Sequence, residues 1–420
     1  MTVTYLEDQS APQRGGLAPR VVSEPADRDG LADVLLQYNR AIGNDDALGN
    51  CERLRGAAVA VVTGQQAGLL TGPLYTIYKI ITAINLAAAY ERTNNQAVVP
   101  VFWNATEDHD LSEIAPFYYP EREWRADFPR YGIAAEALPM QPCRTVIDAY
   151  LATVDSDRRA AISALIEPDG FDGYGYFSSA LIARLFRGTG LVILEPRILR
   201  SLGQPFFERA ITQAQGVADA LAAGAAQMQE AGLMPSFVAG TGSGVFVLDE
   251  QGVRRHQRRD NSWDEGALLS LVADRPDRLS TGAYLRPVLQ SYLLPVLYCV
   301  GGASEIRYQQ QLPGLFDLFD ITMPDLVERH HATLLTSKEY AVMDRIGLTV
   351  IDLMQGASAI YNGIDNGAID RLFRCVYPRN AAQERRINVF YFIEAAGPDL
   401  IGELLDCFDP LEVRHYVIRL

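Results

Sequence analysis

Three carboxylates and one imidazole occupy four consecutive positions, Glu107, Asp108, His109 and Asp110. Charged groups at this density are costly to bury, so they either face solvent or belong to a functional site. Neighbouring carboxylates raise the pKa of a histidine, which predicts that His109 titrates in the range useful for acid–base catalysis. Residues adjacent in one loop rarely converge on a single metal ion, and we predict no metal site. A solvated loop without a function is the alternative interpretation.

The glycine-rich segment between Thr63 and Tyr75 is a second candidate. Its glycines allow a positive φ and the close approach of a ligand to the backbone. If a helix starts at the end of the segment, free amides there would suit a phosphate or a carboxylate. The segment matches neither of the nucleotide fingerprints GxGxxG and GxxxxGK(S/T). A structural turn in which two glutamines cap backbone groups explains it equally well. The candidate binding residues here are Thr63, Gly64, Gln65, Gln66, Gly72, Tyr75 and Lys79.

A third candidate combines Arg286 with the segment from Gly301 to Tyr308. An arginine can bind a carboxylate through two parallel hydrogen bonds, although Arg286 is also explained by a surface ion pair. Paired glycines, Gly301 and Gly302, follow an apolar run and precede a helical pattern that carries Glu305 and Tyr308. Glu305 in a first helical turn is equally what capping preferences produce.

The elements that would position these clusters form an α/β pattern. Residues 57–63 and 98–104 are valine-rich apolar runs typical of buried parallel strands, and residues 74–90 between them have helical spacing. Residues 191–195 and 293–300 are further buried strands. Because ligands bind at the carboxyl ends of parallel strands, the clusters that follow residues 63 and 104 should face one crevice. These patterns predict an α/β fold built on a parallel sheet, with inserted α/β segments and a C-terminal helical region.

The remaining segments indicate insertions and a tail. We expect helices at 146–166 and 204–232 and a hairpin at 237–255. We also expect a helix at 333–362 and a helix-rich tail from 372 to 420. The predicted organisation is a catalytic core at 1–330 with inserted segments at about 120–180 and 205–280, followed by a helical region at 331–420.

Composition narrows the functional classes. The chain has 420 residues, of which 48% are hydrophobic, and a net charge of −15, which disfavours binding to nucleic acid. Its basic run from Arg254 to Arg259 is interpreted as a solvated hairpin or loop. No apolar run reaches the length of a membrane helix and the first 20 residues resemble no secretory signal, so we expect a cytoplasmic protein that binds no membrane. The five scattered cysteines predict neither a disulfide framework nor a zinc site, and His330 and His331 are interpreted as non-functional.

Three stretches together resemble one family, the cysteine-adding enzymes of bacillithiol biosynthesis. They are VTGQQAGLLTGPLYTIYKI at 62–80, VPVFWNATEDHDLSEI at 99–114 and LRPVLQSYLLPVLYCVGGASEIRY at 285–308. The tail from Gln383-Glu384-Arg385 to His415 is similar as well. The resemblance implies a Rossmann-type core and the condensation of L-cysteine with the amine of glucosaminyl-malate, a step in the synthesis of a low-molecular-weight thiol. It also implies that the three stretches line one substrate pocket.

The chemistry of such a condensation leads us to expect the following roles for the candidate residues. His109 would act as general base or orient the substrate, with Asp108 and Glu107 completing the catalytic group. Asp108 and Asp110 would bind the cysteine amine or sugar hydroxyls. Arg286 and Lys79 would hold the malate carboxylates or a phosphate. The remaining predicted binding residues are Asn104, Gly301, Gly302, Glu305, Tyr308 and those of the glycine-rich segment.

The sequence leaves three matters open. Amide formation requires an activated acid, and ATP or ADP is a possible cofactor that the sequence does not identify. The rival interpretations are a nucleotidyltransferase-like or deacetylase-like enzyme that uses the same crevice, and a non-catalytic paralogue that binds the substrate. The family usually carries a long helical hairpin before the tail, but only about forty residues, roughly 333–371, take its place here and they lack sustained heptads. A homodimer is therefore expected to form through another surface, if one forms.

Overall fold

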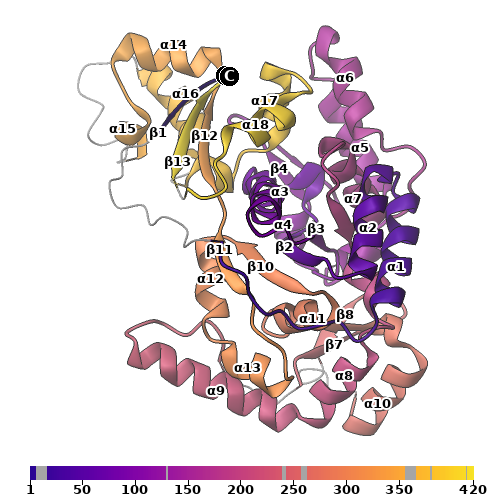
Figure 1. Ribbon diagram of the computed structural model, residues 1–420. Helices are drawn as coiled ribbons and strands as arrows, with labels where there is room; N and C mark the ends of the chain where they lie inside the picture. The colour runs from indigo at the N-terminus through magenta and orange to yellow at the C-terminus, as the bar shows by residue number, and fades with distance from the viewer. Residues whose placement is uncertain are drawn as a thin grey trace.

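The protein is described by a computed structural model that covers residues 1–5, 17–128, 131–238, 243–256, 263–354, 366–378, 381–412 and 414–420. At its centre lies a five-stranded, all-parallel sheet with the strand order β11-β10-β2-β3-β6 (Figure 1). The strands are β2 (Val59–Gln66), β3 (Val98–Ala105), β6 (Val192–Leu194), β10 (Val296–Gly301) and β11 (Asp325–Glu328). The predicted Rossmann-like α/β fold is confirmed.

The order of the strands creates a switch point beside β2. The chain first builds the sheet outward from β2 to β3 and β6, and then crosses to the other side of β2 to add β10 and β11. The connections that follow β2 and β10 therefore run toward opposite edges of the sheet, and they separate at the carboxyl ends of these two strands. In open α/β sheets, ligands bind in the crevice at such a point.

Both faces of the sheet are buried, which explains the apolar character of its strands. On β2, Val59 and Val61 pack with Leu86 of α3 (Tyr75–Asn94). Ala60 and Val62 point to the opposite face, which is covered by α1 (Arg28–Ala41) and α2 (Leu48–Arg55). The predicted βαβ unit is therefore present, and it fixes where the ends of β2 and β3 lie.

The segments that we predicted to be insertions contain more helices and strands than their periodicity predicts. The expected helix at 146–166 is two helices that are interrupted at 152–155, and the one at 204–232 is two helices that meet at Gln213. The hairpin expected at 237–255 is the pair β7 and β8, to which β9 adds a third strand; glycines 240 and 242 lie outside the described residues. The elements are β4 (Pro116–Tyr118), β5 (Glu123–Arg125), α4 (Leu111–Ile114), α5 (Gln141–Leu151), α6 (Ser156–Ile166), α7 (Tyr174–Leu185), α8 (Gln204–Thr212), α9 (Ala214–Glu230), β7 (Val245–Leu248), β8 (Arg254–His256), α10 (Glu265–Asp274), β9 (Leu279–Thr281), α11 (Arg286–Leu293), α12 (Ala303–Gln309) and α13 (Pro313–Leu318).

The C-terminal region contains a sheet as well as helices. Its strands have the order β1-β13-β12, which brings the first residues of the chain beside the last (Figure 1). The predicted helix at 333–362 is wrong at its start, because residues 333–335 belong to β12 and pair in parallel with β13; residues 355–362 lie outside the described part. The elements are β1 (Thr2–Tyr5), β12 (His331–Leu335), α14 (Ser337–Ile346), α15 (Val350–Met354), α16 (Asn366–Val376), α17 (Val389–Ala396), α18 (Leu400–Cys407) and β13 (His415–Arg419).

The lengths and the apolar character of the described helices bear on two predictions, that the chain has no long coiled-coil arm and no membrane helix. The longest described helix after residue 330 is α16, with 11 residues. Among the described helices, none combines the length and the apolar character that a membrane span requires.

Candidate functional site

A cavity of about 500 Å³ lies at the switch point, where β2 and β10 end. It is lined by residues from all three stretches that the sequence singled out and by two arginines from further along the chain. The lining residues are Gly64, Gln65, Gln66, Tyr75, Lys79, Asp108, Glu113, Arg286, Gly302, Ala303, Ser304, Glu305, Tyr308, Arg329 and Arg385.

Lys79 and Glu305 join the two strand ends across the floor of this cavity. The Lys79 side chain is 2% exposed and pairs with Glu305, while its Nζ donates to the Gly64 carbonyl at 3.0 Å and to Gln65 Oε1 at 2.7 Å. Burial lowers the pKa of Lys79, and the Glu305 carboxylate opposes that change. Glu305 Oε2 also accepts from the Gly302 amide at 2.9 Å. An ammonium group has three donors, and all three of Lys79 have acceptors in Gly64, Gln65 and Glu305, so Lys79 stabilises the two strand ends at the site.

Asp108 lies between two guanidinium groups. Its Oδ1 is 3.3 Å from Arg254 Nη1, and its Oδ2 is 3.3 Å from Arg286 Nη1. Arg254 comes from β8, is 6% exposed, and also donates to Ser280 Oγ at 3.1 Å. Two cations therefore share one carboxylate, which leaves an excess of positive charge beside the cavity. The prediction that the basic run is solvated was wrong for Arg254, because the hairpin folds this side chain inward; residues 257–259 lie outside the described part.

The other members of the acidic cluster do not line the cavity. His109 is half-buried, and burial, aided by Arg254, lowers its pKa although Asp108 and Asp110 oppose the change. The predicted rise in the pKa of His109 was therefore wrong. Asp110 caps α4 by accepting from the Ser112 amide at 2.9 Å. Glu107 is 1% exposed, and its burial raises its pKa.

Three further predicted residues lie behind the cavity wall. Asn104 Nδ2 donates to the hydroxyls of Ser178 and Ser179, each at 2.8 Å. Thr63 Oγ1 donates to the Val300 carbonyl at 2.9 Å, which ties β2 to β10. Gly301 ends β10 and is buried. These side chains and backbone atoms hold the strand ends in place and do not line the cavity.

The glycine-rich segment is held by the C-terminal region. Gly72 has a φ of +69°, a conformation that glycine adopts without strain. Asn388 Nδ2 donates to the carbonyls of Leu70 at 2.7 Å and Gly72 at 2.8 Å.

The amides at the start of α3 are largely occupied. Those of Leu74, Thr76 and Ile77 donate to carbonyls at 2.9, 3.0 and 3.0 Å. The prediction that they are free for an anion was wrong for these three, and the positive charge of the site comes from arginine side chains.

Residues near the C-terminus complete one wall of the cavity. Arg329 and Glu384 are 5% and 4% exposed and form two hydrogen bonds, at 2.9 and 2.7 Å. His331 adds a bond of 2.9 Å from Nδ1 to Glu384 Oε1. Arg385, next in the chain, is exposed, lines the cavity and has no carboxylate partner among the described residues. Sequence reasoning missed Arg329 and Arg385, although Gln383-Glu384-Arg385 belonged to the recognised tail.

A second compartment of about 350 Å³ adjoins the first. The two share the lining residues Gln65, Gln66, Tyr75, Glu113 and Arg385. Burial raises the pKa of Tyr75 to about 12, with Glu113 and Glu305 adding to the rise and Arg329 and Arg385 opposing it. The Tyr75 hydroxyl therefore stays protonated where the compartments meet. Gly72, predicted as a binding residue, lines only this second compartment.

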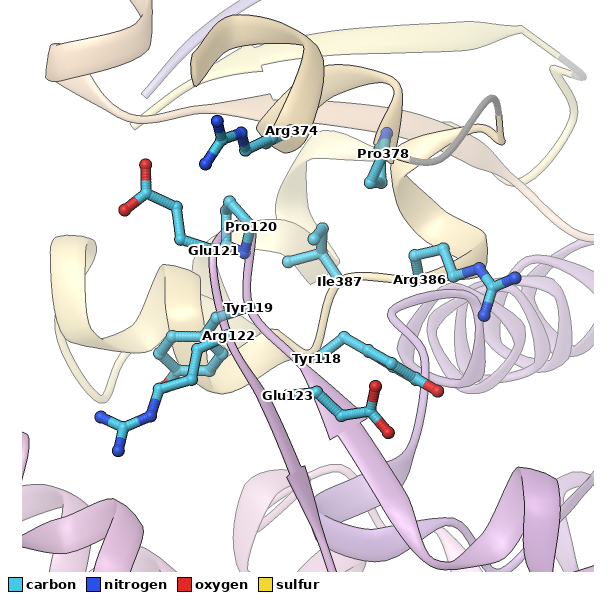
Figure 2. A pocket seen from close by; sticks show the side chains of 10 residues that line it. All are labelled: Tyr118, Tyr119, Pro120, Glu121, Arg122, Glu123, Arg374, Pro378, Arg386 and Ile387. Carbon is cyan, nitrogen blue, oxygen red and sulfur yellow. The ribbon is translucent and has the colours of Figure 1, made fainter. Parts of the chain in front are cut away.

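A third, smaller pocket of about 230 Å³ adjoins the second compartment. Figure 2 shows it between the hairpin of β4 and β5 and the C-terminal segment that carries Arg374, Pro378 and Arg386. Tyr118 and Arg386 line both this pocket and the second compartment. Among the described residues, no group of three or more His, Cys, Asp or Glu side chains comes together in a way that could hold a metal ion.

A Rossmann-like sheet with a charged cavity at its switch point defines the class of protein, and comparison with known families gives the particular one. Residues 11–330 match the family described as "Bacillithiol biosynthesis BshC, N-terminal Rossmann-like domain". Residues 367–420 match "Bacillithiol biosynthesis BshC, C-terminal coiled-coil domain". The chain belongs to the BshC family, as the sequence predicted.

Individual relatives agree with this assignment. A protein of Geobacillus kaustophilus named "Putative cysteine ligase BshC" is 35% identical over 362 residues, 79% of this chain and 66% of the relative. One of Bacillus licheniformis with the same name is 31% identical over 423 residues, 91% of this chain and 75% of the relative. The chain thus spans 66% of the length of the relative from G. kaustophilus, slightly under two thirds.

Proposed function

We propose that this protein joins the carboxyl group of L-cysteine to the amine of glucosaminyl-malate, which makes it an amide-forming ligase of bacillithiol biosynthesis. The names of its relatives, which describe cysteine ligases, support this proposal. The single observation that carries it is the composition of the cavity at the switch point, which mixes cationic and anionic side chains. Both substrates combine an amine with carboxylate groups, so a cavity with both signs of charge suits them.

Arg286 is the proposed binding residue for a malate carboxylate. It lines the cavity, and it shares Asp108 with Arg254, so that one carboxylate only partly balances two guanidinium groups. The planar guanidinium matches the geometry of a carboxylate. Asp108 and Tyr308 would then hold Arg286 in position, since the pKa of Arg286 is raised by both groups against the effect of burial.

His109 is the proposed general base. The sugar amine would attack the cysteine carboxyl carbon once that carboxyl had been activated as a phosphate or adenylate, and the activating group would leave as the amide bond forms. The amine must lose a proton in this step, and a base must be unprotonated to accept it. Burial lowers the pKa of His109, which favours the neutral imidazole at neutral pH. His109 follows Asp108 in the chain but does not line the cavity. The bound substrate or the loop that carries His109 must therefore move to bring the imidazole to the amine. Catalytic hydrogen bonds are often long before the substrate binds.

The setting of the reaction is proposed as the cytoplasm, because all five cysteines carry free thiols as in proteins of reducing compartments. Small molecules are the proposed partners. Any homodimer would use a surface other than a long coiled coil.

Mass spectrometry of reaction mixtures tests the proposed function. The protein is incubated with glucosaminyl-malate, L-cysteine and ATP, and each component is omitted in turn. We expect a product whose mass equals the two substrates less one water, formed only when both are present. Binding of glucosaminyl-malate without any product would indicate a non-catalytic paralogue. A requirement for added divalent metal, with release of an acyl group in place of condensation, would indicate a deacetylase-like enzyme.

A further inference from the structure

The border between the two compartments carries one cation and one anion that the protein itself leaves without ionic partners. Arg385 has no carboxylate partner and Glu113 has no cationic partner among the described residues. Glu113 instead accepts a hydrogen bond from the Gln66 side chain. Most other charges at the cavity are paired, as in Lys79 with Glu305 and Arg329 with Glu384. Two unpaired charges of opposite sign at one border suit a ligand that carries both signs.

Glu113 and Arg385 both influence the hydroxyl group of Tyr75, which lies at the same border. Glu113 raises the pKa of the Tyr75 hydroxyl and Arg385 lowers it, although burial is the larger influence. Partial burial and the nearby Asp110 raise the pKa of Glu113, so its charged form is disfavoured there. A cationic group beside Glu113 would relieve this electrostatic cost.

Nine residues line the second compartment but not the first. Six of them are apolar or glycine, namely Gly68, Gly72, Pro73, Pro116, Phe117 and Ala381, and three are polar, namely Ser112, Tyr118 and Arg386. The glycines pack against each other so closely that a Cβ on Gly68 would lie 2.7 Å from the Gly72 Cα. The apolar part of the wall, which includes this close glycine contact, suits a short side chain of low polarity such as the mercaptomethyl group (–CH2–SH) of cysteine.

We infer that the second compartment is the cysteine site, in which Glu113 binds the α-ammonium group and Arg385 binds the α-carboxylate. This inference rests on the proposed function and adds to it the residues that select the amino acid. Because Arg385 and Glu113 both also line the larger cavity, the charged groups of cysteine lie at the border, and the carboxyl group faces the compartment proposed for glucosaminyl-malate. The thiol points to the apolar wall, away from the bond that forms.

Binding measurements with cysteine and two truncated analogues test the inference without relying on turnover. Isothermal titration calorimetry under reducing conditions compares the parent with Glu113→Gln and Arg385→Gln. We expect each variant to bind L-cysteine at least about tenfold more weakly, since each loses a hydrogen bond to a charged group. Cysteamine lacks the carboxylate, so Arg385→Gln should not weaken its binding further. 3-Mercaptopropionate lacks the ammonium group, so Glu113→Gln should not weaken its binding further.

Matched surface variants serve as controls. Arg307→Gln and Glu230→Gln remove exposed charges that lie outside the lining of both compartments, and they should bind cysteine as the parent does. A parent that binds no cysteine, or variants that bind it as tightly as the parent, would overturn the inference.

Kinetics separates this inference from the proposed function. If the parent forms product, both variants should raise the KM for cysteine while the KM for glucosaminyl-malate stays within about twofold. A rise in the KM for glucosaminyl-malate alone would overturn the inference and leave the ligase proposal intact. Selective loss of cysteine binding in a protein that forms no product would support the cysteine site while the ligase proposal fails.

Discussion

Glu384→Gln probes the buried ion pair that fastens the C-terminal segment beside the cavity. Glu384 and Arg329 are almost fully buried and share two hydrogen bonds, and His331 adds a third. Glutamine keeps the shape of the side chain but removes its charge. The variant leaves the Arg329 guanidinium buried without its counter-charge, so we expect a clear loss of stability.

The size of this loss follows from the titration of Glu384. Burial raises its pKa, but His331 and Arg329 outweigh burial and lower it from 4.5 to about 2. The difference corresponds to about 3 kcal/mol of stability at neutral pH. Removing one partner from a buried ion pair costs about 3–5 kcal/mol in other proteins, which is the same range. We therefore expect Glu384→Gln to lower the free energy of unfolding by about 3 kcal/mol.

The loss of stability in Glu384→Gln should also depend on pH, which provides a second test of the prediction. A carboxylate with a lowered pKa stabilises the fold fully above pH 4.5, and the contribution is lost as the pH falls toward about 2. For His331, burial lowers the pKa, but Glu328 and Glu384 outweigh it and the net change is a rise above 6.5. Its contribution is therefore present below pH 6.5 and is lost as the pH rises through the raised value. The difference between parent and variant should be largest between about pH 4.5 and 6.5.

Urea denaturation across this pH range measures the effect. Glu24→Gln is the control, because Glu24 pairs with Arg28 at the surface and is 68% exposed. The control should change stability by no more than about 0.5 kcal/mol. A loss below about 1 kcal/mol in Glu384→Gln, or a loss that does not shrink in acid, would refute the account of this ion pair.

Four further predictions concern the site and the C-terminal arm. Lys79→Met should lower the free energy of unfolding by about 3 kcal/mol in urea denaturation, because it leaves Glu305 without its partner. The double variant Lys79→Met/Glu305→Gln should lose less than the sum of the two single-variant losses, and additive losses would show that the two side chains act independently. Gly72→Ala should cost about 1–2 kcal/mol by the same method, because its φ of +69° strains a residue with a Cβ, and an unchanged stability would contradict that reasoning. His109→Ala should abolish product formation in the mass-spectrometric assay while stability stays within about 1 kcal/mol, whereas full activity would remove His109 from the mechanism. Small-angle scattering should show a compact particle, and a long protruding arm would contradict the predicted absence of an extended coiled coil.

Local sequence patterns were sufficient for the central βαβ unit. The apolar runs that became β2 and β3 are buried on both faces, so their composition identifies them without knowledge of their neighbours. The strand β12 was mistaken for part of a helix, because its partner β13 lies about eighty residues further along the chain. A strand whose partner lies so far along the chain cannot be recognised from the local pattern of apolar and polar residues.

The candidate site was predictable where it depends on strand ends, and unpredictable where distant segments meet it. Lys79, Arg286 and Glu305 follow from the motifs at those ends, and all three line the cavity. Arg254 and Arg385 reach the site only because the hairpin of β7 and β8 and the C-terminal segment fold over it. The pKa of His109 was predicted in the wrong direction, because sequence reveals neighbouring charges but not burial.

The position of the bound product tests the central claim most directly. That claim places the joining of cysteine to glucosaminyl-malate in the cavity at the ends of β2 and β10. A crystal structure of the protein with the condensed product should show the malate end beside Arg286 and the cysteine end between Glu113 and Arg385. Product bound in the third pocket, shown in Figure 2, with the switch-point cavity left to solvent, would contradict it.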